Sequence, residues 1–259
     1  MTRRRFVLLV AAGSAAYTGV VACASFSASG EPTVSADASA DGSADVSAET
    51  ASEGGPFCAS LVPQPTFCLD FDEGDPVGSG FEQTAGDAAS IDTRFFVSPP
   101  ASALVVGSGS TTFMQRQFDE SAAGYDVRLK LRIGGEDGGG PPLEQFAIPL
   151  RLSTDGCEIS LILEGDGSLD ATRRDLMPAT NIRYPLLRRP TPGVWSAVHL
   201  ELLRTAGVTR FRLELDGKPA LDLTDTLCPT FAGRPMFGIG MIYADGVEAR
   251  FDDVVFDRK

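Results

Sequence analysis

Tyr125-Asp-Val-Arg-Leu-Lys-Leu-Arg-Ile133 alternates apolar and charged residues without a break. Successive side chains of a β-strand point to opposite faces, so this stretch as a strand has one apolar and one charged face. Residues 210–216 repeat the pattern, with Phe211, Leu213 and Leu215 between charged neighbours. Such alternation is typical of antiparallel strands that pack on a core with one face and meet water with the other.

Short apolar runs between clusters of Gly, Pro, Asp and Ser predict further strands. No window shows a sustained apolar period of 3.6 residues, so helix should be scarce. Many short strands joined by turns favour an all-β fold, an antiparallel jelly-roll sandwich of two sheets, over a parallel α/β fold. We expect one such domain over residues 57–259. The further predicted strands are 67–72, 91–97, 102–107, 112–118, 145–152, 158–164, 194–203, 219–223, 235–242 and 248–256.

The chain begins with Arg3-Arg4-Arg5, and an apolar stretch follows to Ala22. A basic segment before an apolar one is typical of a signal peptide. A transmembrane helix needs about 20 strongly apolar residues, whereas Gly13, Tyr17 and other weakly apolar residues dilute this stretch. We therefore predict a cleaved signal peptide over residues 1–22. Residues 2–7 also resemble the twin-arginine export motif, so the Sec and twin-arginine routes both stay open.

Val20-Val-Ala-Cys23 resembles a lipobox, in which the Cys is acylated and becomes the mature N-terminus. The resemblance implies a bacterial lipoprotein whose partner is the lipid bilayer, with Cys23 as the attachment site. The alternative is an ordinary signal-peptidase site followed by a cysteine. Ala24 gives no retention signal of the kind that Asp provides in some inner-membrane lipoproteins. We expect an outer-membrane lipoprotein of the cell envelope, facing the periplasm or the surface.

Residues 23–56 consist almost entirely of Ala, Ser, Gly, Asp, Glu, Thr and Pro after the cysteine. Such a segment buries too little apolar surface to offset its backbone entropy, so we predict a disordered low-complexity tether. Asp37, Asp41 and Asp45 recur at a regular spacing there. They lack the glycine turn of a calcium loop and are interpreted as a solvated acidic linker.

The formal net charge is −13, and removal of residues 1–22 with their three arginines makes it −16. So acidic a chain is a poor ligand for nucleic acid or for anionic lipid surfaces. We predict a monomer that is soluble beyond its anchor.

Four cysteines follow Cys23, and an even number in an exported protein predicts two disulfides. The sequence permits three pairings, of which we favour the pairing of neighbours: Cys58 with Cys68, and Cys157 with Cys228. A zinc site is the alternative, but no CxxC pair is present and the chain has one histidine.

Residues 165–193 are predicted to form a long connection between strands. Long connections in compact domains are often functional, so its basic and aromatic residues are candidate ligand-binding residues. The alternative is a solvated loop whose arginines offset the acidic surface. The candidates are Arg173, Arg174, Arg183, Tyr184, Arg188 and Arg189.

Three stretches of the second half resemble known domains in order and spacing. Residues 192–202 resemble the Trp-led strand of laminin-G-like domains, and residues 211–221 resemble the hairpin that follows, with Asp216-Gly217 as its turn. Residues 251–256 are similar to the closing strand of the concanavalin A-like lectin and glucanase superfamily. The resemblance makes 67–72 the opening strand and implies that the first and last strands lie side by side.

The same resemblance implies a structural calcium ion. In many members of the superfamily an Asp at the start of the closing strand, here Asp252, binds calcium. Hard cations take six to eight oxygen ligands, and nearby carboxylates could supply several of them. In the alternative, Arg250, Arg258 or Lys259 offsets these carboxylates. The predicted ligands are Asp252, Asp253, Asp70 and Asp72.

Function does not follow from the fold alone. Retaining glycoside hydrolases need two carboxylates about 5 Å apart. In the glycosidases of this fold the carboxylates lie on one strand. Residues 214–218 begin like that strand, but Lys218 stands where the second Glu is required. The one histidine, His199, is predicted to tether or pack strands and not to act in catalysis. We therefore predict that the chain is not an enzyme but a binding module for carbohydrate or an extracellular partner, with Trp195 in the core. The alternatives are a structural lipoprotein without a small ligand and a glycoside hydrolase.

Overall fold

The computed structural model describes most of the segment predicted to fold. The described residues are 57–72, 77, 80–85, 89–107, 112–119, 121–134, 147–154, 156–164, 168–176, 179–225, 233–242 and 248–259. The predicted signal peptide, Cys23 and the tether lie outside the described residues, as does Cys228. Within these ranges no helix is long and apolar enough to cross a membrane.

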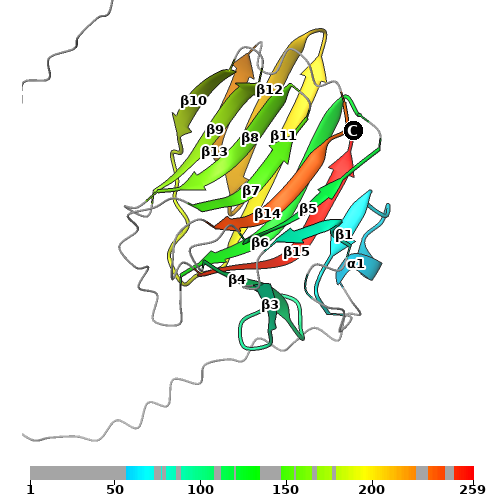
Figure 1. The fold of residues 1–259 in the computed structure, drawn as a ribbon, viewed down its shortest axis with the longest axis vertical. Coiled ribbons are helices and arrows are strands. Elements are labelled where there is room, and N and C mark those ends of the chain that lie inside the picture. The colour runs from blue at the N-terminus through cyan, green and yellow to red at the C-terminus, as the bar shows by residue number, and fades with distance from the viewer. Residues whose placement is uncertain are drawn as a thin grey trace, which may run out of the picture. The chain divides into compact units, whose positions relative to one another are not determined.

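The described strands form two antiparallel sheets that lie one over the other (Figure 1). Sheet A runs β13 (Lys218–Asp225), β12 (Val208–Leu215), β11 (Ser196–Thr205), β6 (Gly124–Ile133), β15 (Glu248–Arg258), β4 (Ser102–Val106) and β3 (Ala89–Asp92), and β1 (Phe67–Leu69) also pairs with β15. Sheet B runs β10 (Ala179–Pro185), β9 (Leu169–Leu176), β8 (Cys157–Leu163), β7 (Ala147–Ser153), β14 (Met236–Ile242), β5 (Thr112–Gln117) and β2 (Gln83–Ala85). The one helix among the described residues is α1 (Phe57–Ser60). The predicted all-β sandwich and the scarcity of helix are confirmed.

The core forms between the inner faces of the sheets, because the alternating strands bury every second side chain. Val127 and Leu200 of sheet A and Leu161 of sheet B are fully buried. Phe256 of sheet A stacks on Phe118 next to β5, with ring centroids 4.3 Å apart. Each large apolar side chain buried in this way contributes about 1.5–3 kcal/mol to stability. The apolar half of the alternating pattern thus holds the two sheets together.

The first and last strands lie side by side, as the resemblance implied. β1 pairs with β15 in antiparallel register, with Phe67 opposite Phe256 and Leu69 opposite Val254. β12 and β13 form the expected hairpin, with Asp216 and Gly217 at φ values of 52° and 68°. Two successive residues in the left-handed region form a turn that matches the twist of a hairpin.

Two local predictions are wrong. Residues 165–193 are not a long connection, because β9 and β10 pair along their whole length within that segment. β9 was not predicted because most of its residues are polar or charged. Its inward residues Leu169 and Ala171 are nevertheless buried. The strand predicted over 91–97 ends at Asp92. The following residues cross the outer face of sheet A, where the Phe95 ring covers the guanidinium groups of Arg132 and Arg250 at 3.9 and 4.8 Å.

The disulfide between Cys58 and Cys68 is confirmed, with a Cα separation of 5.7 Å. It ties α1 to β1. Cys157 is also disulfide-bonded. Its predicted pairing with Cys228 stays a prediction, because Cys228 lies outside the described residues.

Candidate functional site

The outward face of sheet B carries a row of side chains from adjacent strands, which we call the polar row. Its members lie opposite one another in the strand register, while Leu161, Leu150 and Ile239 form the neighbouring inward row. Strand alternation therefore points the polar row away from the core. In order across the sheet the polar row consists of Arg183, Thr172, Ser160, Arg151, Gly238 and Gln115.

Small residues occupy three positions of the polar row. Ser160 and Thr172 are 2% and 6% exposed, and Gly238 is buried. A Cβ added to Gly238 would lie 3.4 Å from the Cβ of Gln115 and from the carbonyl oxygen of Met114. Glycine within a strand often marks a place where another group approaches the backbone. Two of these small residues, Thr172 and Ser160, lie between the two arginines of the polar row.

Ion pairs fix the two arginines of the polar row. Arg151 forms an ion pair with Glu158 at 2.5 Å, and Glu158 also accepts a hydrogen bond from the Ser160 hydroxyl at 3.2 Å. Arg183 pairs with Glu164 at 2.6 Å and with Asp170 at 3.6 Å. A guanidinium has five N–H donors, and each ion pair holds its arginine in place. The face offers fixed donors and acceptors with little net charge.

The structure does not gather the six candidate ligand-binding residues into one site. Arg183 belongs to the polar row, and Arg174 is exposed on the same face of β9. Arg173 and Tyr184 lie on the opposite side of the sheet, in register with Ile182 and Ala171. Arg188 and Arg189 are exposed in the segment after β10. Their binding roles stay predictions.

Arg173 has a structural partner in its own strand. Its guanidinium donates two hydrogen bonds to the Asp175 carboxylate, at 2.8 and 2.5 Å. These bonds hold the pKa of Asp175 below its usual value, with Thr180 as a further donor. Asp175 thus links Arg173 of β9 to Thr180 of β10.

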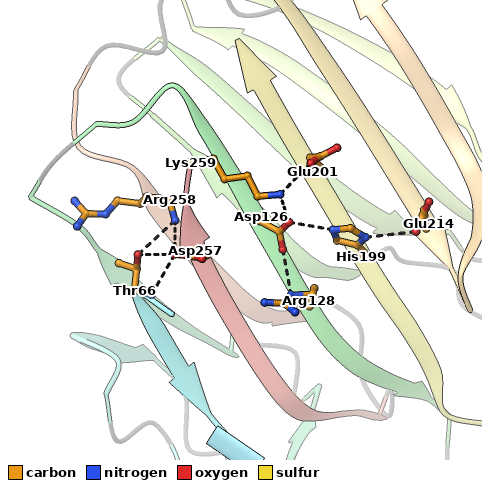
Figure 2. A network of polar contacts seen from close by, with 9 residues as sticks. All are labelled: Thr66, Asp126, Arg128, His199, Glu201, Glu214, Asp257, Arg258 and Lys259. Carbon is orange, nitrogen blue, oxygen red and sulfur yellow. Dashed lines mark hydrogen bonds and ion pairs between the residues drawn. The ribbon is translucent and has the colours of Figure 1, made fainter. Parts of the chain in front are cut away.

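The outward face of sheet A carries a second polar cluster, centred on Asp126 (Figure 2). The Asp126 carboxylate lies 3.2 Å from Nε2 of His199, 2.6 Å from Nζ of Lys259 and 3.2 Å from Nε of Arg128. Burial alone would raise the pKa of Asp126, but the bonds from Lys259 and His199 hold it below its usual value. The cluster joins β6 and β11 to Lys259, the residue that follows β15.

His199 bridges three strands of sheet A. Its Nε2 faces Asp126 of β6 and its Nδ1 faces Glu214 of β12, at 3.2 and 3.4 Å. Glu214 also pairs with Arg212 at 2.5 Å. The prediction that His199 tethers strands is confirmed. The prediction that Trp195 lies in the core is wrong. Trp195 is the residue before β11, and its side chain is partly exposed and not part of the core.

Three of the predicted calcium ligands, Asp252, Asp253 and Asp70, are buried, and the fourth, Asp72, accepts a hydrogen bond from the amide of Ala101 at 3.4 Å. Both oxygens of Asp252 accept hydrogen bonds, from the amides of Val97 and Ser98 at 2.7 and 3.1 Å and from the Ser98 hydroxyl at 3.1 Å. Asp253 accepts from the same hydroxyl at 2.8 Å, and Asp70 accepts from the amide of Cys58 at 2.9 Å.

These carboxylates do not form a ready metal site in the part of the chain that the structure describes. No three His, Cys, Asp or Glu side chains there are close enough to hold a metal ion together. Burial raises the pKa of Asp252 to about 7, and the neighbouring Asp253 adds to the increase. Burial also raises the pKa of Asp253, against the Ser98 hydrogen bond. Calcium binding stays a prediction.

Comparison with known proteins defines the class of fold. Neither a protein-family model nor a curated protein matches the sequence. Among solved structures, alginate lyase Aly36B is similar with a TM-score of 0.52 at 10% identity, over 74% of this chain and 96% of that chain. The laminarinase catalytic domain from Thermotoga maritima MSB8 gives a TM-score of 0.49 at 9% identity, over 76% of this chain and 98% of that chain. The endo-1,3-beta-glucanase from Streptomyces sioyaensis gives 0.45 at 11%, over 75% and 96%.

At these identities the likeness shows the fold alone. The predicted fold, a jelly-roll sandwich of two antiparallel sheets, agrees with it. The prediction that the chain is not an enzyme is corrected. An alginate lyase has a similar fold, so the fold is compatible with enzymatic activity. That prediction rested on the carboxylate pair of hydrolases, which residues 214–218 do not supply. A lyase is another class of enzyme, so a missing hydrolase pair does not exclude catalysis.

Proposed function

We propose that this chain is a membrane-anchored lipoprotein of the cell envelope whose sandwich binds a glycan along the polar row of sheet B. The observation that carries the proposal is the alignment of Arg183, Thr172, Ser160, Arg151, Gly238 and Gln115 across adjacent strands. The similar alginate lyase acts on a carbohydrate polymer, which supports the choice of ligand class.

The chemistry of the polar row suits sugar hydroxyls. Each sugar hydroxyl both donates and accepts, and the row offers guanidinium donors at Arg151 and Arg183 and an amide with both functions at Gln115. The ion pairs with Glu158 and Glu164 already hold the arginines. A ligand that binds there loses little side-chain entropy on the protein side. Because each arginine has a carboxylate partner, the row favours a neutral glycan over a polyanion.

The anchoring part of the proposal rests on the sequence. A lipid-modified Cys23 would attach the chain to the outer membrane, and residues 24–56 would separate the sandwich from the bilayer. The disulfide between Cys58 and Cys68 supports an oxidising compartment, since such bonds persist outside the cytosol. A glycan-binding sandwich on a long tether can reach polymers at some distance from its membrane.

A glycan array probed with the full chain in neutral detergent tests this function. We expect binding to neutral oligosaccharides, and Arg183→Ala and Gln115→Ala should each weaken it about tenfold, the effect of a lost hydrogen bond to a charged or amide donor. Arg210→Ala is the matched control, because Arg210 is also a half-exposed arginine paired with a carboxylate, Asp222, but lies on sheet A. It should bind like the unchanged chain.

The same samples distinguish the other functions. Shortening of a bound oligosaccharide, or ultraviolet absorbance from the double bond that elimination creates, would add catalysis to binding. An array without any bound glycan would overturn the proposal and favour a structural lipoprotein. Equal loss of binding in Arg183→Ala and Arg210→Ala would place the ligand away from the polar row.

A further inference from the structure

A pocket of about 280 Å³ is lined by Arg116, which follows Gln115 of the polar row in β5 and lies on the opposite face of sheet B. Thr66 precedes β1, Arg116 lies in β5 with Phe118 and Asp119 just after it, and Arg258 ends β15. The pocket therefore lies where the first and last strands of sheet A meet β5, the second strand from one edge of sheet B. Binding pockets for drug-sized ligands occupy about 300–1,000 Å³, so this one suits a smaller molecule.

Arg116 supplies one positive charge to the pocket, and aromatic rings surround its guanidinium. Its guanidinium lies over the rings of Phe67 and Phe118 at 4.9 and 5.5 Å, and Nη1 donates to the carbonyl of Gly80 at 2.9 Å. Within the described part of the chain, its buried Nε has no hydrogen-bond partner. A buried donor without a partner costs free energy.

Arg258 supplies a second positive charge to the pocket. Its backbone amide is held by the Asp257 carboxylate at 2.9 Å and lies 3.4 Å from the Thr66 hydroxyl. Its side chain extends away from the Asp126 cluster (Figure 2). The two arginines come from different sheets, and a carboxylate accepts hydrogen bonds from several guanidinium N–H groups at once.

One carboxylate also lines the pocket. Asp119 is 92% exposed at its side chain and lies 3.7 Å from Arg234, which is itself mostly exposed. Such an exposed pair is worth little, so Asp119 weakens the positive potential of the pocket without cancelling it.

We propose that this pocket binds a small organic carboxylate of about the size of a monosaccharide acid. Arg116 and Arg258 hold the carboxylate, and the rest of the ligand lies against Phe118 and the Thr66 hydroxyl. The carboxylate could belong to a free sugar acid or to the acidic end of a longer glycan. The site is separate from the polar row, so it does not depend on the proposed function.

Calorimetric titration of the full chain in neutral detergent tests the proposal, with glucuronate as the probe. Glucose, which has the sugar ring without the carboxylate, should not bind. Acetate, which has the carboxylate without the ring, should bind more weakly than glucuronate. A glucuronate-ended oligosaccharide that binds more tightly than the monomer would identify a glycan end as the source, and equal affinity would identify the free acid.

Substitutions locate the site. Arg116→Gln and Arg258→Gln should each raise the Kd for glucuronate about tenfold or more, as expected for a lost charge-assisted bond. Asp119→Asn should lower the Kd about two- to fivefold by removing a repulsive charge. Arg210→Gln, an arginine on β12, should leave it unchanged. Equal binding of glucose and glucuronate, or an unchanged Kd in Arg258→Gln, would overturn the proposal. If Arg116→Gln does not fold, the Kd values of Arg258→Gln and Asp119→Asn still decide it.

Discussion

Nε2 of His199 lies 3.2 Å from the carboxylate of Asp126, although 73 residues separate the two in the chain. The contact crosses from β11 to β6 at the centre of sheet A. Lys259 joins the same carboxylate and also Glu201 on β11, at 2.6 and 3.0 Å. Because Asp126 is only 6% exposed, these partners replace the water that its charge would otherwise bind.

Asp126→Asn should therefore destabilise the sandwich. The amide keeps the shape of the side chain but loses the charge that His199, Lys259 and Arg128 face. We expect the free energy of unfolding to fall by about 1–3 kcal/mol, the range for hydrogen bonds to charged groups. Urea unfolding measures it. Asp222→Asn, which removes an exposed carboxylate from the same sheet, is the control and should change stability much less.

The same carboxylate should contribute to the loss of stability in acid. The pKa of Asp126 is lowered in the folded chain from 3.8, so the unfolded chain binds more protons near that pH. Its contribution is fully present well above pH 3.8 and is lost as the pH falls through 3.8 and through the lower folded pKa. Unfolding curves at a series of pH values should show a flatter acid limb in Asp126→Asn. An identical slope in both proteins would contradict this assignment.

Arg250 is the largest fully buried side chain among the described residues, and its loss should be costly. Its Nε donates to Asp92 at 2.7 Å and its Nη1 to Glu248 at 3.0 Å, beneath the Phe95 ring. Removing one partner of a buried ion pair typically costs about 3–5 kcal/mol, because the other charge stays buried. Arg250→Ala should therefore unfold at much lower urea. Arg94→Ala, which removes the exposed partner of Asp92, serves as the control.

The sequence pattern predicts the fold of this chain better than its site. Alternation identifies β6 and β12 because one face of each is apolar. It fails for β9, where Arg173 occupies an inward position at the rim, and for residues 93–97, where Phe95 packs on arginines instead of the core. The polar row and the Arg116 pocket need the strand register, since Arg183 and Gln115 become members of one row only when the sheet forms. That row joins strands that are far apart in the chain, so no pattern within a single strand identifies its members.

Cys23→Ser should release the chain from the membrane fraction. Acylation is the only anchor that the sequence predicts, and the acidic sandwich has no attraction to anionic lipid. Fractionation of cells expressing each form, followed by immunoblotting, measures the distribution. Cys58→Ser is a useful comparison, because it breaks the disulfide to Cys68 and leaves the anchor. A Cys23→Ser chain that still sediments with membranes would show that the lipobox resemblance is misleading.

Calcium should raise the melting temperature of the full chain if Asp252 and Asp253 serve as ligands. Asp70, Asp252 and Asp253 are 3%, 0% and 8% exposed, and three buried carboxylates are costly without a cation. An ion that binds only the folded chain stabilises it by mass action, by about 2.7 kcal/mol at a concentration 100 times the Kd. Thermal melts in EDTA and in millimolar calcium measure the difference. Asp252→Asn keeps an oxygen that can accept from the Val97 amide but loses the charge, so it should abolish the calcium-dependent increase. If the two melting curves of the unchanged chain coincide, the hydrogen bonds from Val97 and Ser98 are the whole role of Asp252.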